Sequence, residues 1–256
     1  MISITKLFKI LSGKKYRKCP SGAIINPAEI RGLNAGLINS EQIMAYCDSY
    51  ATGLAGDDRE KGLRLSWNVA SPKEAAETLE WLSLYGHRFL YDIVFQGYIK
   101  GDSEGIDLEI FQTLVKSGRY GDIETNENDI QAAYETAMEM LENLRLIYRT
   151  LKDKVNGPYL PLDYSAGILA WDLGRLVTVA RLSFDGGYIG QSELSRILVH
   201  VDKELSANFS SWPQFAKSYI IGRAAWGGQT ITLDGIIGIT EGLMTDKDSP
   251  WLLSPL

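Results

Sequence analysis

The residues most able to do chemistry in this chain are a few charged side chains set among apolar helical sequence between residues 165 and 228. Arg175, Arg181, Arg223, Asp172 and Glu193 have largely apolar neighbours, so we expect all of them to be buried. Asp172 and Arg175 are three residues apart and can meet on one face of a helix. A buried charge without a partner is strongly unfavourable, so these side chains must be paired.

Two interpretations of these charges stay open. In the first, they form a structural ion-pair network that fixes how neighbouring helices pack. In the second, one guanidinium is left over because the three arginines outnumber the two acids, and it binds an anionic ligand. Arginine holds carboxylate or phosphate through two parallel hydrogen bonds. Tryptophans accompany the charges and could lie over such a ligand. The candidate cluster, for ligand or structure, is Trp171, Asp172, Arg175, Arg181, Glu193, Trp212, Arg223 and Trp226.

Residue types and spacing give no support to other chemistries. No serine, cysteine or acid lies at a spacing that would orient the ring of His87, so we predict no catalytic residue. His87 follows Gly86 directly, where it is expected to hydrogen-bond the last carbonyls of a helix. With His200 as the only other histidine, the sequence predicts no zinc site, no other metal site and no cofactor. We therefore lean towards a protein that is not an enzyme.

Composition limits the class of protein. The 256 residues are 45% hydrophobic, which is ample for a core. The net charge of −6 argues against nucleic-acid binding and is compatible with a basic protein partner. Cys19 and Cys47 are too few for a disulfide framework, so we expect a reducing, cytoplasmic location. No apolar run reaches about 18 residues, so no transmembrane segment is predicted.

The N-terminal residues 1–18 combine an apolar stretch with scattered lysines and a final basic run, Lys14 to Lys18. They lack the uncharged core and the cleavage site of a secretory signal. One interpretation is a short amphipathic helix in peripheral contact with anionic lipid. The other is a leading helix followed by a basic linker, so we assign residues 1–26 to a helix and linker that precede the main domain.

The predicted fold is all-α, with little or no β-structure. Apolar residues at spacings of three and four over 165–184 predict a helix that is apolar all round, and therefore buried at the centre. The longest predicted helix covers 127–155, and the only strand candidate is 229–233. We expect a single globular domain of about ten helices over 27–256, with a candidate subdomain boundary near 117–127.

A series of motifs also carries a family resemblance. The motifs are Trp67, Leu79-Glu80-Trp81-Leu82, Gly86-His87-Arg88, Ala170-Trp171-Asp172-Leu173-Gly174-Arg175, Ala180-Arg181, Gly187-Tyr188-Ile189, Glu193, Phe209, Ser211-Trp212, Phe215, Tyr219 and Gly222-Arg223 through Trp226. In this order and spacing they resemble the bacterial family of unknown function DUF1266, over a core of residues 57–226. The resemblance implies a bacterial, soluble, helical domain and no particular activity.

The leading functional prediction is a non-enzymatic module that binds a protein partner, of an immunity or regulatory type. It depends on the lack of a nucleophile–base pair in the sequence, the acidic balance, and the many Trp and Tyr residues that serve well as contact anchors. The alternative is an enzyme or small-molecule binder, which would hold an anionic ligand on the arginines of the candidate cluster beneath its tryptophans.

Overall fold

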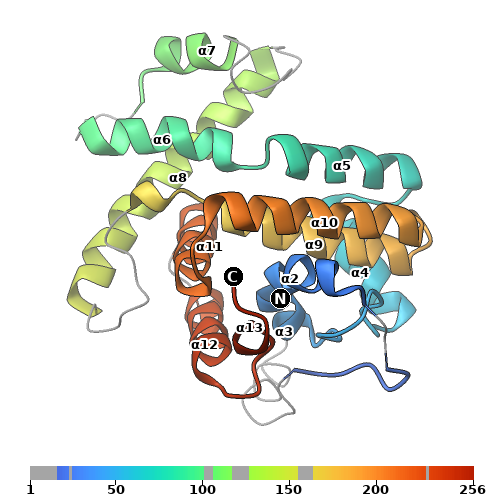
Figure 1. Ribbon diagram of the computed structural model, residues 1–256. Helices are drawn as coiled ribbons and strands as arrows, with labels where there is room; N and C mark the ends of the chain where they lie inside the picture. The colour runs from blue at the N-terminus through green and yellow to red at the C-terminus, as the bar shows by residue number, and fades with distance from the viewer. Residues whose placement is uncertain (1–15, 23–24, 101–105, 117–126, 155–163, 229–230) are drawn as a thin grey trace. The chain divides into compact units, whose positions relative to one another are not determined.

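A computed structural model describes residues 16–22, 25–100, 106–116, 127–154, 164–228 and 231–256 (Figure 1). No strand is present among these residues, and all of their regular structure is helical, so the predicted all-α fold is confirmed. The α-helices are α2 (Pro27–Ala35), α3 (Leu37–Ile43), α4 (Gly56–Trp67), α5 (Pro72–Leu84), α6 (Arg88–Lys100), α7 (Leu108–Lys116), α8 (Glu127–Lys154), α9 (Leu169–Asp185), α10 (Gln191–Asn208), α11 (Trp212–Gly227), α12 (Ile231–Thr245) and α13 (Pro250–Leu253).

The chain divides into two compact units, each built from segments that are distant in the sequence. Unit 1 comprises Met1–Ser83, Leu173–Phe215 and Gly238–Leu256, and unit 2 comprises Leu84–Asp172 and Ala216–Ile237. Helices α9, α11 and α12 run without interruption from one unit into the other. Most of the candidate subdomain boundary, residues 117–126, lies outside the described residues.

Helix α9 is the buried helix that the apolar pattern predicts. Most of its polar residues are buried with its apolar ones, and Asp172 is 0% and Arg181 is 2% exposed. The helix begins at Leu169 rather than at the predicted residue 165, because Tyr164–Ala166 forms a separate 3-10 turn. Gly167 then takes a positive φ of 64°, which separates this turn from α9.

The strand candidate is wrong where the structure describes it. Ile231 begins helix α12, whose first turn includes the rest of the candidate, and residues 229–230 lie outside the described part. The β-branched residues of this run are spaced to suit a helix as well as a strand, and short apolar runs are ambiguous in this way. No helix among the described residues has the length and apolar character needed to cross a membrane.

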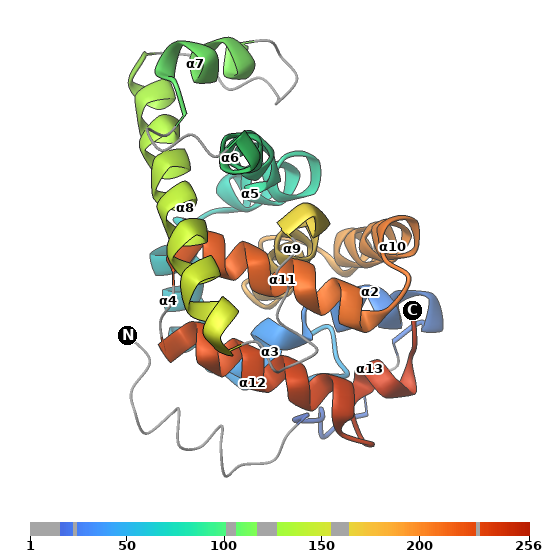
Figure 2. The same cartoon turned by 90° about the vertical axis from the view of Figure 1, so that its left-hand side faces the viewer.

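In unit 2, the long helix α8 packs against α6 and α7 (Figure 2). Its prediction over 127–155 is confirmed within one residue. The Tyr134 hydroxyl donates to the carbonyl of Ile106 at 2.7 Å, and Asn143 Nδ2 donates to the carbonyl of Ala225 at 2.9 Å. The second bond holds the last turn of α11 against α8. The buried stripe of α8 consists of Ile130, Ala137, Met140, Leu141, Leu144 and Ile147.

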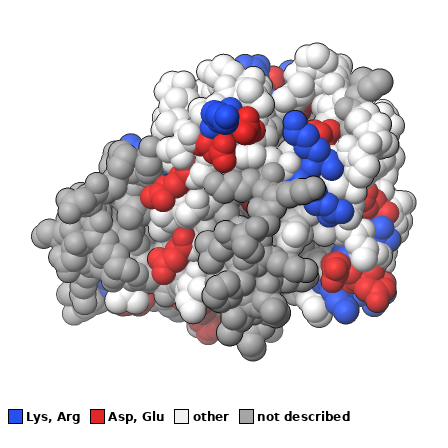
Figure 3. Space-filling view, turned by 90° about the horizontal axis from the view of Figure 1, so that it is seen from below, with Lys and Arg blue, Asp and Glu red and all other residues white. Residues whose placement is uncertain are grey.

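Charged side chains of both signs are interspersed on the face of the molecule drawn in Figure 3. One elongated group of Lys and Arg lies right of centre in that view, and Asp and Glu lie close to it.

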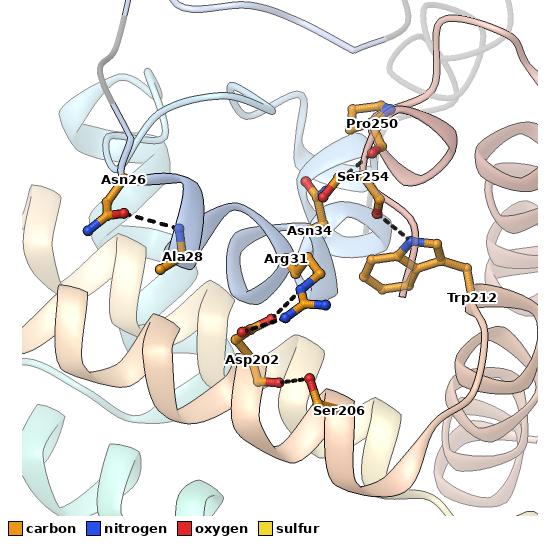
Figure 4. A network of polar contacts seen from close by, with 9 residues as sticks. All are labelled: Asn26, Ala28, Arg31, Asn34, Asp202, Ser206, Trp212, Pro250 and Ser254. Atoms are coloured by element: carbon orange, nitrogen blue, oxygen red, sulfur yellow. Dashed lines mark hydrogen bonds and ion pairs between the residues drawn. The ribbon is translucent and has the colours of Figure 1, made fainter.

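In unit 1, helices α2 and α10 approach each other closely. A Cβ atom at Gly32 would lie 2.0 Å from the carbonyl oxygen of Leu198, so only glycine fits at this contact. Beside it, the Arg31 guanidinium donates to both carboxylate oxygens of Asp202, at 2.7 and 3.0 Å (Figure 4). The side chain of Asn26 caps α2 by accepting from the backbone N–H of Ala28.

The C-terminal segment of unit 1 is docked, as its apolar sequence predicts. Trp251 is 0% exposed, and its ring stacks on that of Trp212 at 4.7 Å between centroids. The indole N–H of Trp251 donates to the carbonyl of Asn34, and that of Trp212 donates to the carbonyl of Ser254 (Figure 4). The two tryptophans therefore hold the end of the chain against α2 and α11.

Tyr16 and Arg17, the first described residues of the basic run, are hydrogen-bonded to unit 1. The buried Tyr16 donates its hydroxyl to the carbonyl of Gly242 at 3.1 Å. Arg17 donates to the carbonyls of Met44 and Gly53, at 2.9 and 3.2 Å. The predicted leading helix, in residues 1–15, lies outside the described residues.

Candidate functional site

The centre of the candidate site in unit 2 is the carboxylate of Asp172. It accepts the backbone N–H of His87 and of Arg88, both at 3.1 Å, and an Nη1–H of Arg88 at 3.2 Å. Asp172 thus caps the N-terminus of α6 and pairs with the first residue of that helix, where a negative charge is favoured. The sequence spacing offers Arg175 as partner, and the structure shows an ion pair with the distant Arg88.

A glycine makes this cap possible. Gly86 has a positive φ of 60°, and a Cβ atom there would lie 2.2 Å from Oδ2 of Asp172. Any other residue would both strain the backbone and collide with the carboxylate. The turn between α5 and α6 is therefore shaped around a buried negative charge.

Three aromatic rings lie next to this cap. The ring centroid of His87 is 5.4 Å from that of Trp171 and 4.1 Å from that of Trp226. Trp171 is 4% exposed and packs over Gly222, where a Cβ atom would lie 2.5 Å from that of Trp171. Trp226 is 42% exposed. The ring of His87 therefore packs against two tryptophan rings, a setting that its position after a helix end does not suggest.

Arg223 lies one helical turn before Trp226 and on the same side of α11. Among the described residues it forms no ion pair with a carboxylate, and its buried Nη1 has no hydrogen-bond partner. Desolvation lowers the pKa of this guanidinium, and the charge interaction with Tyr219 opposes that effect. A Cβ atom at Gly227 would lie 1.8 Å from Nη1, so the guanidinium lies along the last turn of the helix.

Arg181, in unit 1, has a different environment. It is 2% exposed and donates to Ser40 Oγ at 2.9 Å and to three backbone carbonyls of residues 46–51, at 2.7 to 3.2 Å. Desolvation lowers its pKa to about 10, and the nearby carboxylate of Asp185 opposes that shift. Its Nε and both terminal nitrogens are engaged by acceptors of its own unit. This environment favours the structural interpretation for Arg181.

The remaining members of the candidate cluster also belong to unit 1. The guanidinium of Arg175 lies over the ring of Trp67, with its carbon 5.6 Å from the centroid. Glu193 lies in the first turn of α10 and is only partly buried, as is Arg223 in unit 2, so the predicted burial of these two charges is wrong. Trp212 holds the C-terminal segment. Within unit 2, the rings of Trp171 and Trp226 meet that of His87, beside the Asp172–Arg88 ion pair, and Arg223 lies one helical turn before Trp226 on α11.

The sequence reasoning missed one contact of a chemically interesting kind. In unit 1, Oγ of Ser83 lies 3.0 Å from Nε2 of His200, a serine–histidine pair separated by 117 positions. No short-range spacing could have revealed it. Among the described residues no carboxylate hydrogen-bonds to the ring of His200, so the third member of a catalytic triad is not supplied there. The described residues also contain no cluster of acidic, histidine or cysteine side chains suited to a metal ion.

Comparison with known proteins agrees with the resemblance found in the sequence. A family model described as "Protein of unknown function (DUF1266)" matches residues 62–256, which include all of the candidate site. No curated protein and no solved structure matches the chain. The matched region extends beyond the resembling core, which ends at Trp226, to the C-terminus.

Proposed function

The chain belongs to the DUF1266 family, whose description names no activity, and we propose that it is a non-enzymatic module that binds a protein partner. We place it in the cytoplasm of a bacterial cell, in an immunity or regulatory role. Its two cysteines, Cys19 and Cys47, are both free thiols, which fits a reducing compartment. The contact surface in this proposal is the Trp226 surface, defined as Trp226 and the ring of His87 that packs against it.

The observation that carries the proposal is the setting of Trp226. Its ring is 42% exposed, although the rings of His87 and Trp171 already hold it on one side. Leu84 and Ile231, which flank these segments in sequence, are 56% and 74% exposed. Tryptophan is among the residues most enriched at the energetic centres of protein interfaces. A large aromatic ring that stays half exposed suits a contact anchor better than a core residue.

Rigid support strengthens this interpretation. The buried Asp172 carboxylate fixes His87 and Arg88 at the start of α6, and Asn143 ties the last turn of α11 to α8. The ring of Trp226 therefore rests on backbone that is held from two directions. An anchor ordered before binding loses less conformational entropy when the complex forms. The Asp172–Arg88 ion pair then serves the contact surface, because it fixes the backbone on which the ring of Trp226 rests.

A second candidate remains, in which a small anionic molecule occupies the site. The observation in its favour is the buried Nη1 of Arg223, which has no hydrogen-bond partner. Arg181 offers little to such a ligand, since its donors serve its own unit. Thermal unfolding with phosphate, nucleotides and carboxylates separates the candidates: a rise in melting temperature with a free anion, lost in Arg223→Gln, would favour the second.

The test of the leading proposal is a quantitative co-purification from the native host. The tagged chain is compared with Trp226→Ala and with Leu65→Ala, a matched control that removes an apolar side chain 83% exposed on α4. We expect one stoichiometric partner with the wild type and with the control. We expect Trp226→Ala to weaken the complex at least tenfold, since removal of an interface anchor costs about 2 kcal/mol or more.

Thermal melts of the three proteins show whether each variant is folded. Trp226→Phe keeps an aromatic ring on His87 and should retain most of the affinity, so it distinguishes a lost contact from a damaged fold. The proposal fails if no stoichiometric partner is recovered. It also fails if a purified partner binds the folded Trp226→Ala protein as tightly as the wild type.

A further inference from the structure

We infer that the partner segment seated on the Trp226 surface carries a carboxylate next to its apolar group, and that this carboxylate pairs with Arg223. The inference rests on the proposed function and adds the chemistry of the partner to it. It starts from the position of the guanidinium. Arg223 and Trp226 are three residues apart on α11 and so share one side of it, and the absent side chain of Gly227 leaves room for the guanidinium along the last turn.

The charge of Arg223 is not paired with any carboxylate that the structure describes. Its half-buried position removes part of the water that would otherwise solvate it. The carboxylate of the same cluster, on Asp172, is 0% exposed and already accepts from His87 and from Arg88 twice. The acceptors of Asp172 are therefore already in use, and the described residues of unit 2 supply no counter-ion for Arg223.

The surroundings favour a carboxylate over a bare inorganic anion. Arginine binds carboxylate and phosphate alike through two parallel hydrogen bonds. In this site, however, the neighbouring surface is the apolar face of Trp226, which a free inorganic ion leaves uncovered. A carboxylate attached to an apolar group pairs with the guanidinium and also covers the ring of Trp226.

Two sources within a protein can supply this chemistry: the C-terminal carboxylate of a chain, and an Asp or Glu side chain beside an apolar residue. Three small probes separate them. N-acetyl-phenylalanine has a terminal carboxylate, N-acetyl-aspartyl-phenylalanine amide has a side-chain carboxylate, and N-acetyl-phenylalanine amide has none. Binding is followed in the full chain through the indole N–H signal of Trp226 in proton–nitrogen NMR spectra.

We expect at least one carboxylate probe to shift the Trp226 signal in a saturable way, with an affinity at least fivefold above that of the neutral amide. The better of the two carboxylate probes identifies the source. Arg223→Gln should remove the advantage over the amide, and Arg223→Lys should keep part of it. The matched control is Arg64→Gln, which removes an exposed arginine on α4 and should behave as the wild type.

The inference is overturned if the neutral amide binds as well as both carboxylates, or if inorganic phosphate shifts the signal with equal affinity. It is also overturned if the partner recovered by co-purification binds Arg223→Gln within twofold of the wild type. If Arg223→Gln binds the partner normally but Trp226→Ala does not, only this inference fails and the proposed function is still supported. If Trp226→Ala also binds normally, the proposed function fails with it.

Discussion

The most direct test of the architecture is the removal of the Asp172 carboxylate. In Asp172→Ala the backbone N–H groups of His87 and Arg88 lose their acceptor, and the Arg88 guanidinium loses its ion pair. Each buried donor left without an acceptor costs about 1–3 kcal/mol. The Arg88 side chain is 23% exposed and can turn towards water, so its loss is smaller than that of a fully buried ion.

These contributions lead us to expect a loss of about 3–5 kcal/mol in the free energy of unfolding, the range known for breaking a buried ion pair. For a chain of this size each kcal/mol lowers the melting temperature by about 2–4 °C. The fall should therefore reach roughly 6–20 °C by the same scaling. Urea and thermal unfolding, followed by circular dichroism at neutral pH, measure both quantities.

A matched control is Asp202→Ala, which removes the acid of the more exposed Arg31 pair. Its cost should stay near 0–1 kcal/mol, as for other pairs that water can reach, plus a small loss of packing. The double variant Asp172→Ala with Arg88→Met then shows how much of the effect belongs to the ion pair. If Asp172→Ala unfolds within 1 kcal/mol of the wild type, the burial and capping argument is refuted.

Two further predictions concern unit 1. Arg181→Met should lower the free energy of unfolding by at least about 3 kcal/mol, because it leaves several buried acceptors without a donor; urea unfolding at neutral pH checks this, and a neutral result would mean that water replaces the guanidinium. Tyr16 should make stability fall at high pH, since burial raises its pKa from 10.0 to about 12. The neutral phenol is favoured in the folded state, so its contribution is complete below pH 10 and is lost as the pH rises towards 12. Tyr16→Phe should flatten this part of the stability profile, and an unchanged slope would contradict the assignment.

Much of the fold follows from the spacing of apolar residues. The helical class, the extent of α8 and the burial of α9 follow from this pattern, because helix packing requires an apolar face at that period. The start of α9 was placed too early, since a single turn at Tyr164–Ala166 has the same local pattern as the helix. The strand candidate at 229–233 failed for a similar reason, as a short apolar run does not distinguish the two structures.

The partners of the buried charges were harder to predict. The burial of Asp172 and Arg181 follows from their apolar neighbours, whereas their partners depend on chain segments far away in the sequence. Arg88 lies 84 positions from Asp172, and helical spacing indicates only neighbours three or four positions away. The acceptors of Arg181 are mainly backbone carbonyls, which every residue carries and no residue type marks.

The way in which Arg181 is bound has a consequence for the irregular segment 46–52. The loop is closed by the bond from Tyr46 N–H to the carbonyl of Thr52, and Thr52 N–H donates in turn to Asp185. Because the guanidinium binds main-chain oxygens, Arg181 constrains the length of the loop, while side chains such as Asp48 and Thr52 make contacts of their own. One inserted or deleted residue would move the carbonyls out of reach of a side chain anchored on α9.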